Sequence, residues 1–543
     1  MAEEGLASSR RDPIKSSSVG NVAGNRRRQQ AVTVGKERRE ALVRTKRLCR
    51  EGIVSDDDAL LDKEMVIDDE EDEVLNAQTT EAVGELKSVL QSQGKGVAQK
   101  KVESLRNLRR LLSKSDIPPV EAAIKAGAVS ILTHCLSFGS PDEQLLEAAW
   151  CLTNIAAGEP EQTKALIPAL PMLIAHIGEK SSLAVAEQCT WALGNVAGEG
   201  EELRNTLLSQ GALPHLARMM LSNKGSTSRT AAWALSNLIK GPDPKAANEL
   251  IRIDGVLDAI IRHLRKGFFI AYVHAIGVVF LFTLLGLICR DEELATEAAW
   301  VAVYLSALSN IASSMLVKSD LVQLLVGRLA TSVSLQLLIP VLRSLGNLVA
   351  ANSQTAYVVL VPGNEITENA ISALIKCLGS ENRVLKKEAA WVLSNIAAGS
   401  VEHKQLIFSS EAIPLLLRLL STAPFDIRKE VAYALGNLCV APSEGSYQPN
   451  VILEHLVSLI GKGCLPGFIN LVRSADTEAA RLGLQFLELV MRGLPDGEGP
   501  RLVEREDGID AMERFQFHEN EDLRTMANGL VDKYFGEDYG LDE

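Results

Sequence analysis

AAWCLTNIAAG, residues 148–158, is the stretch that decides the fold, because it recurs almost unchanged as AAWVLSNIAAG at 389–399. Close relatives are AAWALSNLIKG at 231–241 and TWALGNVAGEG at 190–200. In each segment a Trp is followed four residues later by an Asn, a spacing that places both side chains on one face of a helix. Four of the five Trp of the chain stand in this pattern, called here the frame: Trp150 and Asn154, Trp191 and Asn195, Trp233 and Asn237, and Trp391 and Asn395.

Degenerate copies extend the frame along the chain. The steps between successive frame positions are 41, 42, 67, 43, 48, 42 and 48 residues. Helical repeats of about 40–47 residues are typical of armadillo and HEAT proteins, and three predicted helices per repeat favour armadillo. The sequence therefore predicts an all-α fold, an armadillo-repeat right-handed superhelical solenoid. The degenerate copies are Trp300 with Tyr304, Arg343 with Asn347, Tyr433 with Asn437, and Arg481 with Gln485.

The ends of one frame helix are also predicted. Ser140 is expected to be the N-cap, with Pro141 as the first helical residue and Glu143 as the capping-box partner. Gly158 is placed to end that helix, because a glycine just beyond the last turn readily adopts the conformation that stops it.

Charge divides the chain. Residues 1–50 carry 13 Lys/Arg and 5 Asp/Glu, a net +8, which leaves −21 on the remainder. A basic arm on an acidic body indicates binding either to nucleic acid or to acidic protein surface, including its own. We expect four regions: a basic and largely disordered or helical arm (1–50), an acidic flexible linker (51–79), the repeat solenoid (80–505), and C-terminal capping helices with an acidic tail (506–543).

Composition argues against secretion and catalysis. The eight Cys include no CxxC pair, which favours buried free thiols in a reducing compartment, and the N-terminus has no apolar signal segment. Phosphate-binding, HExxH and GxSxG motifs are absent from the sequence. We therefore expect no enzyme activity, no catalytic residues, no cofactor and no metal.

The step of 67 residues contains 23 uncharged residues, GFFIAYVHAIGVVFLFTLLGLIC at 267–289. By length and hydropathy this segment could span a bilayer, yet removing it restores the repeat period. Three interpretations stay open: a retained or misassigned exon segment, a tolerated surface insertion, or membrane association. The first is favoured, because a spanning helix would place the two halves of the solenoid on opposite sides of a membrane.

Stacked frame residues suit the binding of an extended peptide. Asn offers both a donor and an acceptor to a peptide backbone, and neighbouring indoles can hold a Lys or Arg stem between them. Carboxylates at the ends of such slots would select basic side chains. The candidates are Glu147, Glu199, Glu388 and Glu430. The alternative is a scaffold for other protein partners, which would require a basic groove to bind acidic or phosphorylated tails.

The basic arm, the acidic linker, the Trp–Asn ladder and the C-terminal FQFHENEDLRTMANGLVDKYFGEDYG (515–540) together resemble the importin alpha family, and in particular a divergent plant branch of it. The resemblance covers nearly the whole chain apart from 267–289. It implies a nuclear import adaptor that shuttles between cytoplasm and nucleus, passing the nuclear pore. Its partners would be importin beta, cargo proteins with nuclear localisation signals, and an export receptor at the C-terminal repeats. Direct binding to nucleic acid is not expected, and membrane association is disfavoured.

The resemblance assigns residues to three sites. The major signal-binding groove comprises Trp150, Asn154, Gly158, Thr163, Trp191, Asn195, Glu199, Trp233 and Asn237. The minor groove comprises Arg343, Asn347, Glu388, Trp391, Asn395, Glu430, Tyr433 and Asn437. Importin beta would bind Arg26, Arg27, Arg28, Lys36, Arg38, Arg39, Arg44, Lys46, Arg47 and Arg50.

Three features depart from the family pattern. Glu199 stands where Asp is usual, and Tyr433 stands where Trp is usual, which predicts a shifted pocket depth and weaker stacking. The basic arm has a sparser Lys/Arg cluster than other members, so autoinhibition by the arm is expected to be weaker.

Overall fold

The structure is a computed structural model that describes residues 69–94, 96–114, 118–178, 181–241, 243–265, 281–351, 370–442 and 449–536. For 69–71 and 281–291 it describes the backbone alone. The described residues are helical and contain no strand. The basic arm (1–50), with its expected importin-beta-binding residues, lies outside the described residues.

The described chain divides between residues 312 and 313 into two compact units, called here the N-terminal unit and the C-terminal unit. The helices of the N-terminal unit are α2 (Asp69–Gln91), α3 (Val97–Leu111), α4 (Val120–Lys125), α5 (Ala128–Cys135), α6 (Asp142–Ala156), α7 (Pro160–Lys164), the 3-10 helix η1 (Ile167–Ala169), α8 (Leu170–His176), α9 (Leu183–Glu199), α10 (Glu201–Ser209), α11 (Ala212–Met220), α12 (Gly225–Ile239), α13 (Lys245–Leu250), α14 (Val256–Arg265) and α16 (Leu281–Leu308). The division falls within α17 (Asn310–Lys318).

The helices of the C-terminal unit are α18 (Leu321–Thr331), α19 (Leu335–Ala351), α21 (Ala370–Leu378), α22 (Arg383–Ala397), α23 (Val401–Phe408), α24 (Ala412–Thr422), α25 (Phe425–Leu438), α26 (Pro449–Gly461), α27 (Leu465–Val472), α28 (Thr477–Gly493), α29 (Glu498–Arg505), α30 (Gly508–Glu513) and α31 (Glu521–Phe535).

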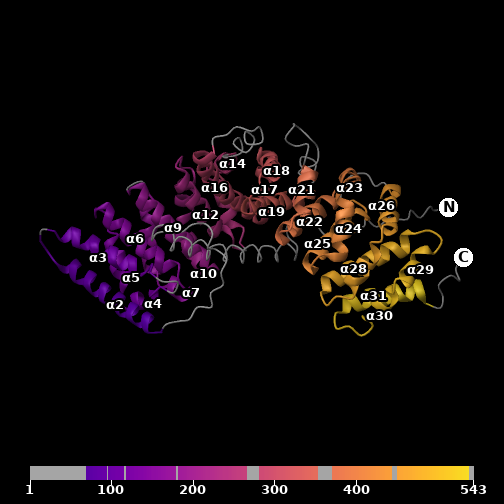
Figure 1. Ribbon diagram of the computed structural model, residues 1–543, viewed down its shortest axis with the longest axis horizontal. Helices are drawn as coiled ribbons and strands as arrows, with labels where there is room; N and C mark the ends of the chain where they lie inside the picture. The colour runs from indigo at the N-terminus through magenta and orange to yellow at the C-terminus, as the bar shows by residue number, and fades with distance from the viewer. Residues whose placement is uncertain are drawn as a thin grey trace, which may run out of the picture. The chain divides into compact units, whose positions relative to one another are not determined.

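Each unit is a stack of three-helix repeats, such as α10, α11 and α12 in one unit and α23, α24 and α25 in the other (Figure 1). The third helix of each repeat carries the frame, and consecutive frame helices pack directly on one another. The helices that contact one another in succession are α6, α9, α12 and α16 in the N-terminal unit, and α19, α22, α25 and α28 in the C-terminal unit. This arrangement confirms the prediction of an all-α armadillo fold.

The expected start of α6 is wrong by one residue. The helix begins at Asp142, and its N-cap is Pro141, whose φ of −57° and ψ of 141° belong to extended backbone rather than helix. Ser140 therefore lies one residue too early to be the cap. The carboxylates of Asp142 and Glu143 occupy the first turn, where they interact favourably with the positive end of the helix dipole. The helix ends at Ala156, and the N–H of Gly158 donates to the Ile155 carbonyl at 3.0 Å.

The acidic linker is shorter than expected. Helix α2 begins at Asp69, so residues 69–79 are helical and belong to the folded unit. Leu75, Thr79, Ala82 and Leu86 are buried at helical spacing along α2, which packs against α3. This apolar face is diluted by the Asp/Glu run that precedes it, and composition alone therefore misplaces the boundary.

The apolar segment at 267–289 is only partly described. Residues 267–280 lie outside the described residues, and 281–289 form the first part of α16, which is 28 residues long. In the described part of the chain no single helix has the length and apolar character needed to span a bilayer. The pair α26 and α27 meets both criteria together, with a bend of 86° between the two helices.

The described cysteines are buried free thiols, as the sequence predicted. Six Cys are buried and form no disulfide: Cys135, Cys151, Cys189, Cys377, Cys439 and Cys464. Burial raises the pKa of each of these thiols, for example to about 11 for Cys135, so they behave as small apolar side chains.

Candidate functional site

Three of the frame Trp keep part of their surface exposed, and all three lie in the N-terminal unit. Trp150, Trp191 and Trp233 are half-buried on α6, α9 and α12. Because these helices pack in succession, their equivalent positions place the indoles one repeat apart. In the C-terminal unit the aromatic frame residues are covered: Trp391 and Tyr433 are each only 6% exposed.

The frame Asn side chains link consecutive repeats. In four repeats Nδ2 of the Asn donates to a main-chain carbonyl of the preceding frame helix, always at the third residue after the frame position. The pairs are Asn195 to Thr153 (3.3 Å), Asn237 to Gly194 (3.1 Å), Asn395 to Gly346 (3.0 Å) and Asn437 to Ser394 (2.9 Å). Asn154 instead donates to the Ser113 hydroxyl at 2.8 Å.

These hydrogen bonds give the Asn ladder a structural task between consecutive repeats. Asn195 and Asn437 have no exposed surface, and Asn154, Asn237 and Asn395 are at most 8% exposed. A buried amide that donates to a main-chain carbonyl fixes the register between two helices. The ladder Asn thus set the positions of the neighbouring indoles, besides any contact with a bound chain.

Glycine lets two of the indoles lie directly on the preceding helix. A Cβ at Gly194 would overlap the ring of Trp233, and a Cβ at Gly346 would overlap the ring of Trp391. Both glycines stand three residues after a frame position. In each unit a residue without a side chain therefore allows the indole of the next repeat to contact the helix backbone. The sequence offered a signal for this role in the shared LGN tripeptide, which the frame analysis did not use.

One candidate carboxylate is already neutralised. Glu147 is 6% exposed and accepts from Nε of Arg106 at 3.1 Å and from Nε of Arg109 at 2.6 Å. The Arg109 guanidinium also lies over the Trp150 ring, 4.2 Å from its centroid. Glu147 therefore holds the first two repeats together rather than selecting a basic ligand. The sequence contained a signal for the cation that pairs with Glu147. Arg109 stands 41 residues before Trp150, which is the frame position of the first repeat.

Arg343 and Glu388, both assigned to the minor groove, form an ion pair with each other. Nη2 of Arg343 lies 3.0 Å from Oε1 of Glu388, and the two side chains are 9% and 7% exposed. The geometry repeats that of Arg109 and Glu147: the frame residue of one repeat meets the residue three before the frame position of the next. Because Glu388 is paired inside the fold, it is not an open carboxylate in this structure.

Tyr433 follows the same rule. Its hydroxyl donates to Oε1 of Glu478 at 2.8 Å, and Lys429 lies 2.7 Å from the other carboxylate oxygen. Burial, followed by the nearby charge of Glu478, raises the pKa of Tyr433 far above its usual range, so the hydroxyl remains a neutral donor. In the N-terminal unit Gln188 stands three residues before Trp191, and its Nε2 donates to the hydroxyl of Thr153, three residues after the frame position, at 2.8 Å.

Another position that recurs in several repeats provides a hydrogen bond to a carbonyl near the C-terminal end of the frame helix. We call the thirteenth residue after a frame position the cap position; it is Thr163, Arg204 and Lys404 after Trp150, Trp191 and Trp391. Each of the three side chains donates to the carbonyl six residues after its frame position, namely Ala156 (3.3 Å), Ala197 (3.4 Å) and Ala397 (2.5 Å). Thr163, assigned to the major groove, is fully buried in this role.

The remaining expected site residues keep accessible surface. Gly158 and Glu199 are half-buried in the N-terminal unit, and Asn347 and Glu430 are half-buried in the C-terminal unit. Among the described residues no group of His, Cys, Asp and Glu side chains is arranged to hold a metal ion.

Comparison with known proteins identifies the repeat. Residues 116–157, 200–240, 366–398 and 400–440 match the Armadillo/beta-catenin-like repeat family. A solved structure of an engineered protein aligns with a TM-score of 0.66 at 22% identity, covering 84% of this chain and 98% of its own. At that identity the likeness concerns the fold alone.

Curated relatives match over the whole length. Importin subunit alpha-9 of Arabidopsis thaliana is 68% identical over 544 residues, covering 100% of both chains. Importin subunit alpha-2 of Oryza sativa subsp. japonica is 63% identical over 533 residues, covering 98% of this chain and 96% of its own. With the frame helices and their stacked repeats, this similarity shows that the chain belongs to the importin alpha family of armadillo-repeat adaptors for nuclear protein import.

Proposed function

We propose that this chain binds Lys/Arg-rich nuclear localisation signals along its frame helices and links their carriers to importin beta through the basic arm at residues 1–50. It would move between cytoplasm and nucleus, and its C-terminal repeats would meet an export receptor. No enzymatic step is part of this function.

The observation that carries the proposal is the set of three half-exposed indoles, Trp150, Trp191 and Trp233, on consecutive packed helices. Two neighbouring indoles can hold the aliphatic stem of a Lys or Arg while their faces attract the cation, with about 0.5–2 kcal/mol per contact. The net charge of −21 on residues 51–543 further favours a cationic chain.

The carboxylates that would select a cation are fewer than the sequence suggested. Glu147 and Glu388 are paired with arginines of the fold. Glu199 and Glu430 keep part of their surface exposed, and they are the side chains we assign to cargo lysines. Glu199 is the last residue of α9. Gly158, also half-buried, stands at the equivalent position of the preceding repeat, eight residues after its frame position.

The test is a titration of the full chain with a fluorescent Lys-rich localisation peptide. Replacing Trp191 and Asn195 with Ala should weaken binding by about 2 kcal/mol, because an aromatic anchor and the amide that positions its helix are both lost. The matched control is Trp300→Phe, since Trp300 stands in the frame but is only 5% exposed; its affinity should stay within about twofold of wild type. Equal affinity of the double Ala variant and the wild type, with helicity unchanged, would remove the indole column from the mechanism.

The role of the arm is tested separately. Deletion of residues 1–50 should abolish capture of importin beta and leave peptide binding intact. Retention of importin beta by the truncated chain would show that the arm does not provide the link.

A further inference from the structure

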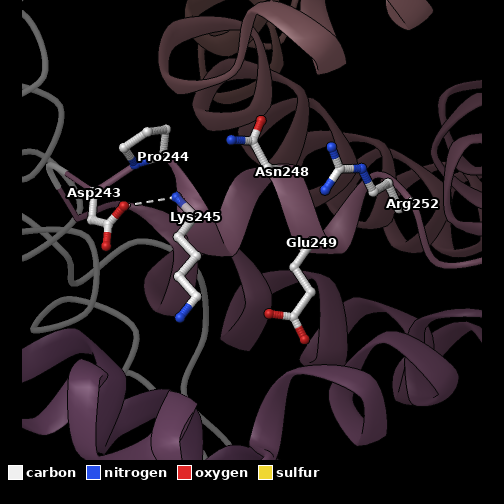
Figure 2. A pocket seen from close by; sticks show the side chains of 6 residues that line it. All are labelled: Asp243, Pro244, Lys245, Asn248, Glu249 and Arg252. Atoms are coloured by element: carbon white, nitrogen blue, oxygen red, sulfur yellow. Dashed lines mark hydrogen bonds between the residues drawn. The ribbon is translucent and has the colours of Figure 1, made fainter.

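A cavity of about 250 Å³ lies in the N-terminal unit between α10, α13 and the end of α12. Arg204 and Gly241 line its inner part, and Glu201, Asp243, Lys245 and Glu249 line its exposed part. Figure 2 shows an adjoining pocket that shares Asp243, Lys245 and Glu249 with this cavity. None of these residues belongs to the expected signal-binding set.

Arg204 is a buried cation with unused hydrogen-bonding capacity. The residue is 7% exposed, and its single hydrogen bond to protein runs from Nη1 to the Ala197 carbonyl at a long 3.4 Å. Its buried Nε has no hydrogen-bond acceptor among the described residues. A buried charge in this condition is costly, and a bound anion would remove the cost.

The equivalent residues Thr163 and Lys404 each have two main-chain carbonyls as hydrogen-bond acceptors. Thr163 donates its single hydroxyl proton to the Ala156 or Glu159 carbonyl. Lys404 donates to the Ala397 carbonyl and also to the Asn437 carbonyl of the next frame helix, at 2.6 Å. Of these three cap positions, only Arg204 combines a positive charge, a buried donor that lacks an acceptor among the described residues, and a place in the lining of a cavity.

The rim of the cavity has the opposite charge. Glu201, Asp243 and Glu249 are exposed carboxylates, accompanied by the exposed Lys245. Figure 2 shows the side chains of Lys245 and Glu249 extending from the same side of α13, away from Asn248, whose Oδ1 accepts from the Ser309 hydroxyl at 2.5 Å. A buried cation surrounded by exposed carboxylates favours a ligand that carries one anionic group next to several cationic groups.

We propose that the Arg204 cavity binds an acidic or phosphorylated side chain of the cargo peptide, next to its Lys/Arg cluster. This inference rests on the proposed function. The sequence frame places Arg204 and Gly241 one repeat beyond Thr163 and Glu199. Since packed helices are about 8–10 Å apart and an extended chain advances roughly 3.3–3.6 Å per residue, the anion lies about three residues from the lysine held beside Glu199.

The experiment scans a single Ser along both flanks of the lysine cluster in a fluorescent peptide. Each peptide is prepared with Ser, phosphoserine or Asp at that position and titrated into the full chain. At one position about three residues from the central lysine, the anionic peptides should bind about tenfold more tightly than the Ser peptide, as expected for a charge-assisted hydrogen bond. Phosphoserine and Asp together test the shared anion chemistry, and the difference between them tells which source the cavity prefers.

Two variants localise the effect. Arg204→Met keeps the aliphatic stem that packs in the cavity and should abolish the advantage of the anionic peptides while leaving the Ser peptide unchanged. Arg252→Met removes an exposed cation that lines the adjoining pocket just beyond the end of α13. It should leave the advantage intact, which excludes a general effect of net charge.

The outcomes separate the two proposals. Binding of the Ser peptide with no gain from an anion at any position would refute the cavity assignment and leave the adaptor function standing. An anion effect that survives in Arg204→Met would also refute it. Failure of every peptide to bind would refute both.

Discussion

The two units use the same frame position in different ways. In the N-terminal unit it carries half-exposed indoles at Trp150, Trp191 and Trp233. In the C-terminal unit it carries Arg343 and Tyr433, and each of these makes a polar contact with a glutamate of the next repeat. The frame position therefore either keeps an indole partly exposed or ties two repeats together, and the side chain that occupies it decides which.

The difference appears in how each unit compensates its buried glutamate. Glu388 has a single cation, Arg343, whereas Glu147 is shared between Arg106 and Arg109. Removing one member of a buried pair leaves the other as an uncompensated charge. The C-terminal unit is therefore more vulnerable to a single substitution at its frame position than the N-terminal unit.

The largest expected effect follows from this contrast. Arg343→Met should destabilise the protein by about 3–5 kcal/mol, because Glu388 is left buried without its cation. Arg109→Met should cost only about 1–2 kcal/mol, because Arg106 still compensates Glu147 and the main loss is the cation–π contact with Trp150. Urea denaturation followed by circular dichroism measures both values.

A double variant controls for lost packing. Arg343→Met combined with Glu388→Leu removes both charges and should recover most of the loss seen for the single variant. If the double variant is as unstable as Arg343→Met alone, burial of an unpaired carboxylate is not the cause.

The sequence predicted the fold well because the frame is periodic and the helices are amphipathic. Period and apolar spacing depend on each helix alone, so they were readable without the structure. The contacts between repeats were not, because they join residues about 40 positions apart whose pairing depends on the register of stacked helices. Glu147 and Glu388 illustrate this limit: as sequence positions they look like ligand carboxylates, and only their distances to Arg109 and Arg343 show otherwise.

The same limit explains the boundary of the linker and the role of Arg204. Composition placed residues 69–79 with the acidic linker, while the sparse apolar face of Leu75 and Thr79 places them in α2. Arg204 lies in a polar stretch without a motif, and its importance comes from burial, which a single sequence does not reveal.

A smaller effect tests the glycine contacts that both units share. Gly194→Ala places a Cβ inside the indole ring of Trp233, and overpacking of this kind costs about 1–3 kcal/mol. The gain in helix propensity from Gly to Ala, about 1 kcal/mol, offsets part of this cost. We expect a net loss of about 1 kcal/mol in urea denaturation, and a similar loss for Gly346→Ala against Trp391.

The matched control is Gly84→Ala in α2, where a Cβ meets no atom within 4 Å. This substitution should stabilise the protein by up to about 1 kcal/mol, because only the propensity term remains. Equal stabilisation by Gly194→Ala would show that the indole does not rest on this backbone.

A change in the pH dependence of stability distinguishes the cap positions of the two units. Burial lowers the pKa of Lys404 to about 7, whereas Arg204 stays charged throughout the accessible range. Between pH 7 and about 10.4 the unfolded chain keeps the lysine proton that the folded chain has released, so stability rises with pH by up to about 1.4 kcal/mol per unit. Lys404→Met should remove this slope.

Neighbouring groups do not account for the same slope. Burial lowers the pKa of His403 and of His455, which places their titration below the window. Burial raises the pKa of Cys464 to about 12 and that of Cys439 well above its usual value. Above about pH 8.5 the unfolded chain therefore loses thiol protons that the folded chain keeps, which lowers stability and opposes the slope from Lys404. Urea midpoints that rise from pH 7 to 9 equally in wild type and Lys404→Met would therefore show that Lys404 remains charged in the fold, held by the Ala397 and Asn437 carbonyls.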